Sequence, residues 1–423
     1  MRQVSPGHGA GRLARPVHAA RAFWGTWWKV ILLGVLTVGS YGLGVYAFGV
    51  IIGPIHESTG WSVGSLSAAF TLSSLIGGFG GAASGWLLDR FGGRPILLGS
   101  LVIGSAFLFL AASAETLPLF IVAWGIGGGA ISAGLFYNVT MALTTRLFPG
   151  DRVRAFSILT FVGGFAAVLY FPLAGLLVDT LEWRLALRIL ILLLVLHVLP
   201  AALLISGGAA GPRSHEGNIA GHGDFGGVLE AFRSRDVLQM IAMFALANMA
   251  FAGISVHQVP AMTAAGVSLG TATAVASARG FLSLPGRAFM EPVTRRLGVA
   301  GATGMAYVLM AAGMLPLAIG GGAVWLFIFT VVTGLAFGTI SPLHGLFAAE
   351  VYGIRRIGTL MGVQSLIGSI FAASGPSLVG LTVDATDGYR VAIILMSGLF
   401  GGALLLLLTR PRPARPGPVL SAP

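Results

Sequence analysis

Long apolar runs separated by short polar connections make up almost the whole chain. A helix that crosses the hydrocarbon core of a bilayer needs about 20 mostly apolar residues, and twelve runs of that kind can be distinguished. They span residues 30–55, 63–88, 96–114, 118–145, 155–178, 185–206, 237–261, 267–290, 299–319, 324–349, 358–383 and 391–409. The pattern therefore predicts an all-α membrane protein with twelve transmembrane helices.

The longest polar connection, residues 207–236, divides the twelve runs into six and six. We therefore expect five regions in order along the chain: a tail at 1–29, a six-helix bundle at 30–206, a linker at 207–236, a second six-helix bundle at 237–409 and a tail at 410–423. The first apolar run exceeds the core of about 7–15 residues found in secretory signal peptides, so we interpret it as a transmembrane helix.

The two halves repeat one another at a nearly constant spacing. Identical residues recur 204 to 206 positions apart: Arg90 and Arg296, Gly92 and Gly298, Pro172 and Pro376, Gly175 and Gly380, Asp179 and Asp384, and Arg184 and Arg390. Such a duplication predicts two pseudo-symmetric bundles. Parallel repeats of this kind are a known transporter plan, in which the substrate binds between the repeats near the bilayer midplane.

The composition excludes several classes of protein. Only 9% of the residues are charged and the mean hydropathy is +0.90, whereas a soluble domain has about 25% charged residues. A soluble enzyme and a disordered scaffold are thereby excluded. The chain has no cysteine, which rules out disulfides, thiolate nucleophiles and Cys-ligated metals. We expect no cofactor, no bound metal and no enzymatic activity.

The basic residues predict an orientation. Of the 25 Lys and Arg residues, 20 fall on the side of the N-terminus and three on the opposite side. Because Lys and Arg concentrate in cytoplasmic connections, we expect both termini in the cytoplasm and the chain in an inner or plasma membrane. The same asymmetry accounts for the net charge of +11 without a nucleic-acid partner.

The connection after the second run carries the sequence GWLLDRFGGR at residues 85–94. It resembles the G-x-x-x-D-R-x-G-x-[RK] signature of the major facilitator superfamily, in the loop where that signature lies. The resemblance implies the major facilitator fold and a conformational latch, in which the Asp pairs with an Arg at a neighbouring helix end. The latch residues are Gly85, Asp89, Arg90, Gly92 and Arg94. In the second half Glu291 replaces the first Gly and Arg295 replaces the Asp, so we expect an asymmetric latch.

Shorter segments narrow the resemblance to one branch of the superfamily. They are residues 57–62, Trp183-Arg184, Gly286-Arg287, Gly375-Pro376 and residues 384–390. Together they resemble the monocarboxylate transporters and the oxalate/formate antiporters. The resemblance implies transport of small organic anions, mono- or dicarboxylates, by alternating access.

No acidic residue lies near the middle of any of the twelve runs, but two arginines lie inside the eighth. A charge at the bilayer centre is costly and usually faces a cavity. Arg279 lies near the middle, and Arg287 lies about 12 Å further along the helix. The resemblance implies that Arg287 holds a substrate carboxylate, although Glu291, four residues on, is placed to neutralise it. We therefore expect Arg279 and Arg287 to bind an anion. The alternatives are that Arg287 extends to the cytoplasmic interface and that Arg279 binds carbonyls exposed near Pro285.

Proton-coupled members of the resembled branch carry an acid four residues before this arginine and a lysine in the first helix. This chain has Ser283 and Val50 in those places. Three histidines remain as titratable groups inside the spans. His257 and His344 lie on runs expected to line the cavity, so each is a candidate to contact substrate or a proton, with a buried core residue as the alternative. We expect His197 to be structural, because the sixth helix faces outward in the resembled fold.

Several uncharged polar residues are further candidates for the cavity lining. They are Tyr41, Tyr46, Tyr137, Asn138, Tyr170, Asn248 and Gln258. Adjacent helical residues point about 100° apart, so at most one of Tyr137 and Asn138 faces the cavity squarely.

These features together predict a monomeric secondary transporter of small organic anions, surrounded by membrane lipid, with or without a coupled proton. One alternative is a multidrug or lipophilic-compound exporter of the same fold, which the lack of an intramembrane acid disfavours. The other is a non-transporting membrane sensor.

Overall fold

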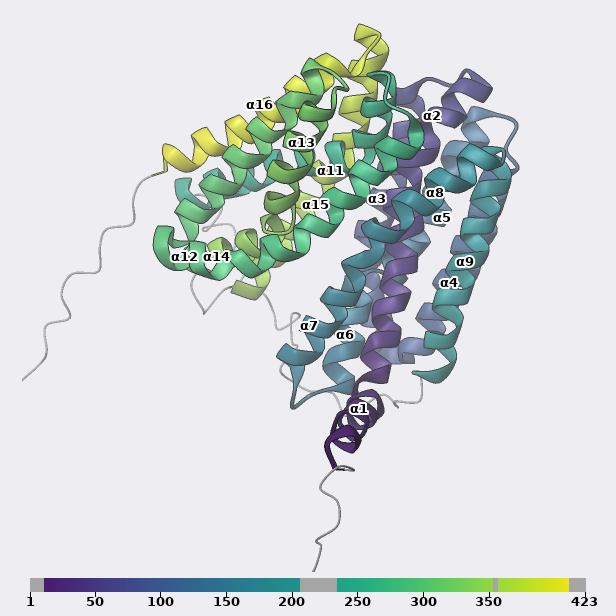
Figure 1. Cartoon of the computed structure of the whole chain (residues 1–423), viewed down its shortest axis with the longest axis vertical. Helices are drawn as coiled ribbons and strands as arrows, with labels where there is room; N and C mark the ends of the chain where they lie inside the picture. Colours follow the sequence, from purple (N-terminus) through teal and green to yellow (C-terminus); the bar gives the residue numbers. More distant parts are fainter. Residues whose placement is uncertain (1–10, 206–233, 353–356, 411–423) are drawn as a thin grey trace, which may run out of the picture.

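A computed structural model of the chain describes residues 11–205, 234–352 and 357–410. Every regular element in these three ranges is a helix, and Figure 1 shows them arranged as two groups of long, roughly parallel rods. Most of the expected linker at 207–236 and nearly all of the C-terminal tail lie outside the described residues.

The first bundle runs from α1 to α9. Its elements are α1 (Gly11–Tyr41), the π-helix η1 (Gly42–Ala47), α2 (Phe48–Thr59), α3 (Val63–Phe91), α4 (Gly93–Ala112), α5 (Leu117–Leu135), α6 (Tyr137–Leu147), α7 (Arg152–Gly163), α8 (Phe165–Thr180) and α9 (Trp183–Leu204). Three of the six expected spans are each divided, the first by η1, the fourth at Phe136 and the fifth at Gly164.

The second bundle runs from α11 to α16. Its elements are α11 (Arg235–Ala264), α12 (Leu269–Ile319), α13 (Ala323–Phe337), α14 (Ile340–Tyr352), α15 (Ile357–Thr386) and α16 (Tyr389–Leu408). The 51-residue α12 contains a non-helical residue, Gly298, and so comprises the eighth and ninth expected spans. The prediction of twelve apolar helices in an all-α membrane fold is confirmed.

The glycines of the repeated loops adopt the same unusual backbone conformation. Gly92 has a φ of 79° and Gly298 a φ of 71°, a region that side chains with a Cβ rarely occupy. Each lies at the sharp turn between two antiparallel helices. Residues 206 positions apart therefore perform the same backbone role, as the duplication predicts.

Part of the expected N-terminal tail is helical. Residues 1–29 were expected to precede the first span as a polar tail, but α1 is helical from Gly11 onward. Ala and Arg, which favour helix, are frequent between Gly11 and Lys29. The helix therefore continues beyond the apolar segment, which begins near Gly25.

The two bundles meet on the membrane face opposite the start of α1, here called the far face. There α3 lies along α15, where the Gly64 N–H donates to the Asp384 carboxylate (2.9 Å). A Cβ on Gly380 would lie only 2.7 Å from the Gly64 Cα, so small residues permit this close approach. The second contact is between α8 and α12, where the Ser277 hydroxyl donates to the Val168 carbonyl (2.7 Å).

The bundles diverge toward the other membrane face, where α1 begins; it is here called the N-terminal face. In Figure 1 they meet beside α2 and α3 and spread apart toward α6 and α7 on one side and α14 on the other. The main contacts of α6 and α7 are with the first bundle, and those of α14 are with the second. Among the described residues, the bundles are therefore in contact at the far face and separated at the N-terminal face.

The α3–α15 contact predicts a cross-link that traps this state. The Thr71 and Ser377 hydroxyls are 2.7 Å apart, and the chain has no native cysteine. We expect Thr71→Cys/Ser377→Cys to form a disulfide on oxidation. The cross-linked protein should lose uptake of the expected organic anion into proteoliposomes and regain that uptake on reduction. Each single variant serves as the control. Unchanged uptake by fully cross-linked protein would show that this contact need not open.

Candidate functional site

Three helices of the second bundle converge on Arg279 of α12, which is only 1% exposed. Its Nε donates to the Thr333 hydroxyl on α13 (2.7 Å), and its Nη1 donates to the Gln258 side-chain oxygen on α11 (3.1 Å). We call Arg279 together with Gln258, Thr333, Phe329 and Phe337 the arginine site. A residue expected to carry charge into the membrane interior is therefore enclosed by protein and does not face lipid.

The arginine site is electrostatically incomplete. The Nη2 atom of Arg279 is buried and has no hydrogen-bond partner in the described part of the chain. The ion pairs among the described residues are Arg146 with Asp89 and Arg184 with Glu182, so none neutralises Arg279. A buried charge without a partner is destabilising by several kcal/mol. The site is therefore suited to an anion that supplies the missing charge and accepts the spare N–H groups.

Aromatic rings cover the guanidinium. The centre of the Phe337 ring lies 4.2 Å from the Arg279 Cζ and that of Phe329 lies 5.4 Å from it. Such cation–π contacts each contribute about 0.5–2 kcal/mol, which lessens the cost of burying the charge without cancelling it. Phe337 also stacks on Phe251 of α11, with centroids 4.4 Å apart. This stacked pair belongs to the layer that leaves Arg279 almost unexposed.

Local sequence on α13 explains how the arginine is held. The Thr333 hydroxyl donates to the Phe329 carbonyl four residues earlier (2.7 Å), which orients its oxygen to accept from Arg279. A Cβ on Gly334 would lie 3.4 Å from the Arg279 Cα, so glycine permits α12 and α13 to pack closely. The sequence analysis missed Thr333 and the two phenylalanines, because α13 reads as an ordinary apolar span.

Arg287, about two turns further along α12, is exposed. Its stem passes beside Gly338, where a Cβ would lie 3.1 Å from the Arg287 Cγ. The expected pair with Glu291 is wrong, since both residues are described and no ion pair joins them. An exposed pair at this spacing gains little in stability, so both side chains stay apart. Arg287 is a second cation without a carboxylate partner among the described residues.

Three tyrosines of the first bundle lie near these arginines. Tyr46 in η1 lies within electrostatic range of Arg279 and Arg287, and Tyr137 at the start of α6 lies within electrostatic range of Arg287. Tyr41 packs on Tyr137 with ring centroids 5.1 Å apart. π-Helical turns such as η1 often occur at functional sites. The fold thus brings Tyr41, Tyr46 and Tyr137 to the side of the first bundle that lies near the arginines.

Asn138 differs from its neighbour Tyr137. Its side-chain amide donates to the Ala133 carbonyl (3.1 Å), and a Cβ on Gly81 of α3 would lie 2.8 Å from its nitrogen. Asn138 therefore spans the break between α5 and α6 next to α3, whereas Tyr137 lies within electrostatic range of Arg287.

His257 lies at the contact between the bundles. Its Nε2 is 3.1 Å from both the Ser67 hydroxyl on α3 and the Pro376 carbonyl on α15, and its Nδ1 is 3.4 Å from the Tyr389 hydroxyl. The next residue, Gln258, binds Arg279. A role for His257 with substrate or a proton stays a prediction.

His344 and Tyr170 lie inside separate bundles. The His344 Nε2 is 2.7 Å from the Tyr307 hydroxyl, and its ring stacks on Phe244 at 3.9 Å. Tyr170 packs against Gly42 and lies 6.2 Å from His197, ring centre to ring centre. All these contacts are within one bundle. None of these contacts involves Arg279 or Arg287, and a role for His344 or Tyr170 with the substrate stays a prediction.

The loop motif forms the pair expected of it. Asp89 pairs with Arg146 at the end of α6, and Arg146 also donates to the Leu88 carbonyl (3.0 Å). Arg90 lies over the ring of Trp86 (5.4 Å). Both partners of the ion pair belong to the first bundle. The pairing is confirmed, while the action of Gly85, Asp89, Arg90, Gly92 and Arg94 as a latch stays a prediction.

The fold and the arginine site can now be compared with known proteins. Residues 34–323 match the family described as Major Facilitator Superfamily. The chain belongs to this superfamily. It is thus a multi-pass membrane protein of a transporter family, and the resemblance drawn from the loop motif is confirmed.

Several named transporters are similar in sequence to this chain. Human monocarboxylate transporter 11 is 27% identical over 356 residues, 77% of this chain and 70% of that protein. Monocarboxylate transporter 13 of Rattus norvegicus is 22% identical over 93% of this chain and 91% of that protein. The oxalate:formate antiporter of Oxalobacter formigenes is 25% identical over 129 residues, so the chain matches 30% of its length.

Solved structures of the superfamily share the fold. The nucleoside transporter NupG aligns with a TM-score of 0.76 at 15% identity, covering 90% of this chain and 98% of NupG. A bacterial homologue of the lysosomal transporter Spinster, inward-facing and occupied, aligns with a TM-score of 0.70 at 14% identity, over 91% and 96% of the two chains. These likenesses show the fold alone.

The incomplete arginine site predicts an unusual stability effect. Arg279→Met keeps much of the side-chain volume and removes a buried charge. Replacing such a charge by an apolar group of similar size is often neutral or stabilising, although the Gln258 oxygen loses its donor. We expect the free energy of unfolding of purified Arg279→Met, measured by thermal unfolding, to stay within about 1 kcal/mol of that of the parent chain or to rise. A loss of several kcal/mol would identify Arg279 as a structural residue.

Proposed function

We propose that the chain is a secondary transporter that moves small organic anions, mono- or dicarboxylates, by alternating access. The observation that carries the proposal is the buried guanidinium of Arg279, which has two neutral acceptors and no carboxylate partner among the described residues. The names of monocarboxylate transporter 11 and the oxalate:formate antiporter agree with an anionic cargo.

The substrate carboxylate binds Arg279 at the end left free by Gln258 and Thr333. Because Nε is used by Thr333 and one Nη1 proton by Gln258, the Nη2 group and the remaining Nη1 proton are the donors available. A guanidinium presents such donors as a planar fork that matches the two oxygens of a carboxylate. The tyrosines of the first bundle lie on the other side of the substrate.

Access to the site changes as the bundles rock. In the state described, the far face is closed by the α3–α15 and α8–α12 contacts. Arg287 is exposed toward the open face, where it attracts anions before they reach Arg279. The Phe251–Phe337 pair covers Arg279, so these rings move aside when the substrate binds.

We also propose the orientation and the membrane. The excess of Lys and Arg at the N-terminal face assigns that face to the cytoplasm of an inner or plasma membrane. In that orientation the structure faces inward. The carrier acts as a monomer, and either a proton or a counter-moving anion balances its cargo.

An isosteric change beside Arg279 tests the cargo. Gln258→Glu places a carboxylate where the Gln258 oxygen now lies 3.1 Å from Nη1. It supplies the charge that we assign to the substrate, so we expect carboxylate uptake in proteoliposomes to fall by about 100-fold, as when one partner of a buried charge pair is changed. Arg279→Ala should cause a comparable loss.

Controls separate this effect from general damage. Gln239→Glu adds the same charge to α11 at the N-terminal face, where Gln239 bonds to the Leu406 carbonyl, and should leave uptake close to normal. A panel of radiolabelled mono- and dicarboxylates is measured beside a lipophilic cationic dye. A multidrug exporter would be supported instead by two results together. The parent chain would take up no carboxylate, and Arg279→Ala would still transport the dye.

A further inference from the structure

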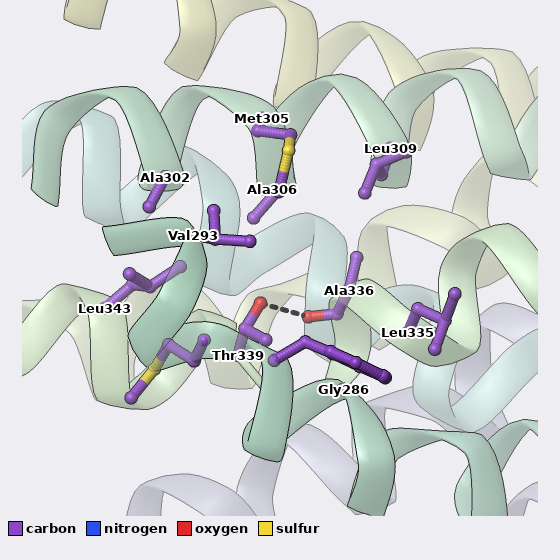
Figure 2. A pocket seen from close by; sticks show the side chains of 12 residues that line it. Gly286, Val293, Ala302, Met305, Ala306, Leu309, Leu335, Ala336, Thr339 and Leu343 are labelled. Atoms are coloured by element: carbon purple, nitrogen blue, oxygen red, sulfur yellow. Dashed lines mark hydrogen bonds between the residues drawn. The ribbon is translucent and has the colours of Figure 1, made fainter. Parts of the chain in front are cut away.

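An apolar cavity of about 210 Å³ lies in the second bundle, away from the arginine site. Figure 2 shows side chains from both halves of α12 and from α13 and α14 pointing into it. The lining residues include Phe289, Met290, Val293, Ala302, Met305 and Ala306. The Thr339 hydroxyl is already bonded to the Ala336 carbonyl (2.8 Å), so the cavity wall offers almost no free polar group.

The cavity opens toward the membrane. Phe289 is 61% exposed and Met305 is 39% exposed, although both are large apolar residues on a transmembrane segment. In a bilayer these side chains contact acyl chains. The cavity is therefore a slot that a lipid chain can enter from the side.

The internal duplication places larger residues of the first bundle at positions equivalent to two of the lining alanines. Ile96 and Ser100 of α4 lie 206 positions before Ala302 and Ala306. Ile96 is 8% exposed, and a Cβ on Gly134 of α5 would lie 3.3 Å from its Cγ2 atom. Ile96 thus packs against α5 in the first bundle, whereas the smaller Ala302 lines the cavity in the second.

The adjoining loop is also charged differently in the two bundles. In the first, Asp89 is paired with Arg146. At the equivalent position the second bundle has Arg295, beside Arg296, and neither arginine has a carboxylate partner among the described residues. Glu291 precedes Arg295 by one turn but forms no ion pair with it. The loop of the second bundle thus carries two exposed, uncompensated cations.

These cations adjoin the end of the slot. Met290 and Val293 line the cavity, and Arg296 is three residues after Val293, so it continues the same face of α12 about one turn nearer the N-terminal face. Arg295 points about 100° away from Arg296 on the helix and adds a second positive charge beside it. An apolar slot that ends at Arg296, with this second cation alongside, matches an amphipathic anion with a long hydrocarbon chain.

We propose that the second bundle binds a single anionic phospholipid, with an acyl chain in this cavity, its phosphate held by Arg296 and the charge of Arg295 beside it. Two guanidinium groups favour an anionic headgroup over a zwitterionic one, whose ammonium they repel. The first bundle binds no such lipid, because the larger Ile96 takes the place of Ala302 and its loop charge is paired. This site is separate from the arginine site and does not depend on the cargo.

Native mass spectrometry of the purified full chain tests the proposal, with phosphatidylglycerol and phosphatidylcholine as probes. We expect one phosphatidylglycerol to be retained in preference to phosphatidylcholine. Arg295→Gln/Arg296→Gln should weaken retention by about tenfold or more, since each basic residue near an anionic headgroup contributes about 1 kcal/mol. Ala302→Ile introduces the residue that the first bundle has at the equivalent position, Ile96. It should fill the slot and weaken retention of both lipids.

Matched variants make the outcomes distinct. Arg152→Gln/Arg154→Gln removes two exposed basic residues from the N-terminal face of the first bundle, and Ala106→Leu enlarges an exposed alanine on α4; both should retain the lipid normally. Arg295→Lys/Arg296→Lys should retain most of the preference. The proposal is overturned if both Gln pairs weaken retention equally, if the two lipids bind alike, or if Ala302→Ile binds as the parent chain does.

Discussion

The unpaired charge of Arg279 is the interaction on which the rest of the structure depends. Water or a carboxylate would normally stabilise a guanidinium, but α11, α12 and α13 surround this one with an amide oxygen, a hydroxyl and two aromatic rings. The two polar groups and the two ring faces lower the cost of burying the guanidinium without neutralising its charge. The site therefore holds a positive potential inside the membrane, which a small anion can satisfy and a cation cannot.

The contacts within the second bundle hold Arg279 in place, whereas the contacts between the two bundles can separate. Within the second bundle, Gly334 and the hydroxyl of Thr333 fix α13 against α12, so the guanidinium keeps its place. Between the bundles, the contacts are short polar bonds and glycine-lined approaches at the far face. Contacts of that kind can separate without exposing a large apolar surface. The bundles can thus rock about a site whose own geometry is preserved.

Much of the fold, but only part of the site, could be predicted from the sequence. The twelve spans, the paired turns at Gly92 and Gly298 and the buried Arg279 follow from hydropathy and from repetition along the chain, which are local properties. Thr333 and Phe337 could not be found, because their role depends on how α13 packs on α12. Spacing alone also misled: Arg287 and Glu291 are four residues apart but unpaired.

The most direct measurement is the thermal unfolding of the purified protein at rising concentrations of carboxylates, each compared with its neutral amide. Our account predicts that a carboxylate stabilises the parent chain, by about 2.7 kcal/mol at 100 times its dissociation constant. The amide should have no effect, and neither compound should stabilise Arg279→Met. Equal stabilisation of both proteins by the carboxylate would contradict the account, because the anion would then bind without the buried guanidinium.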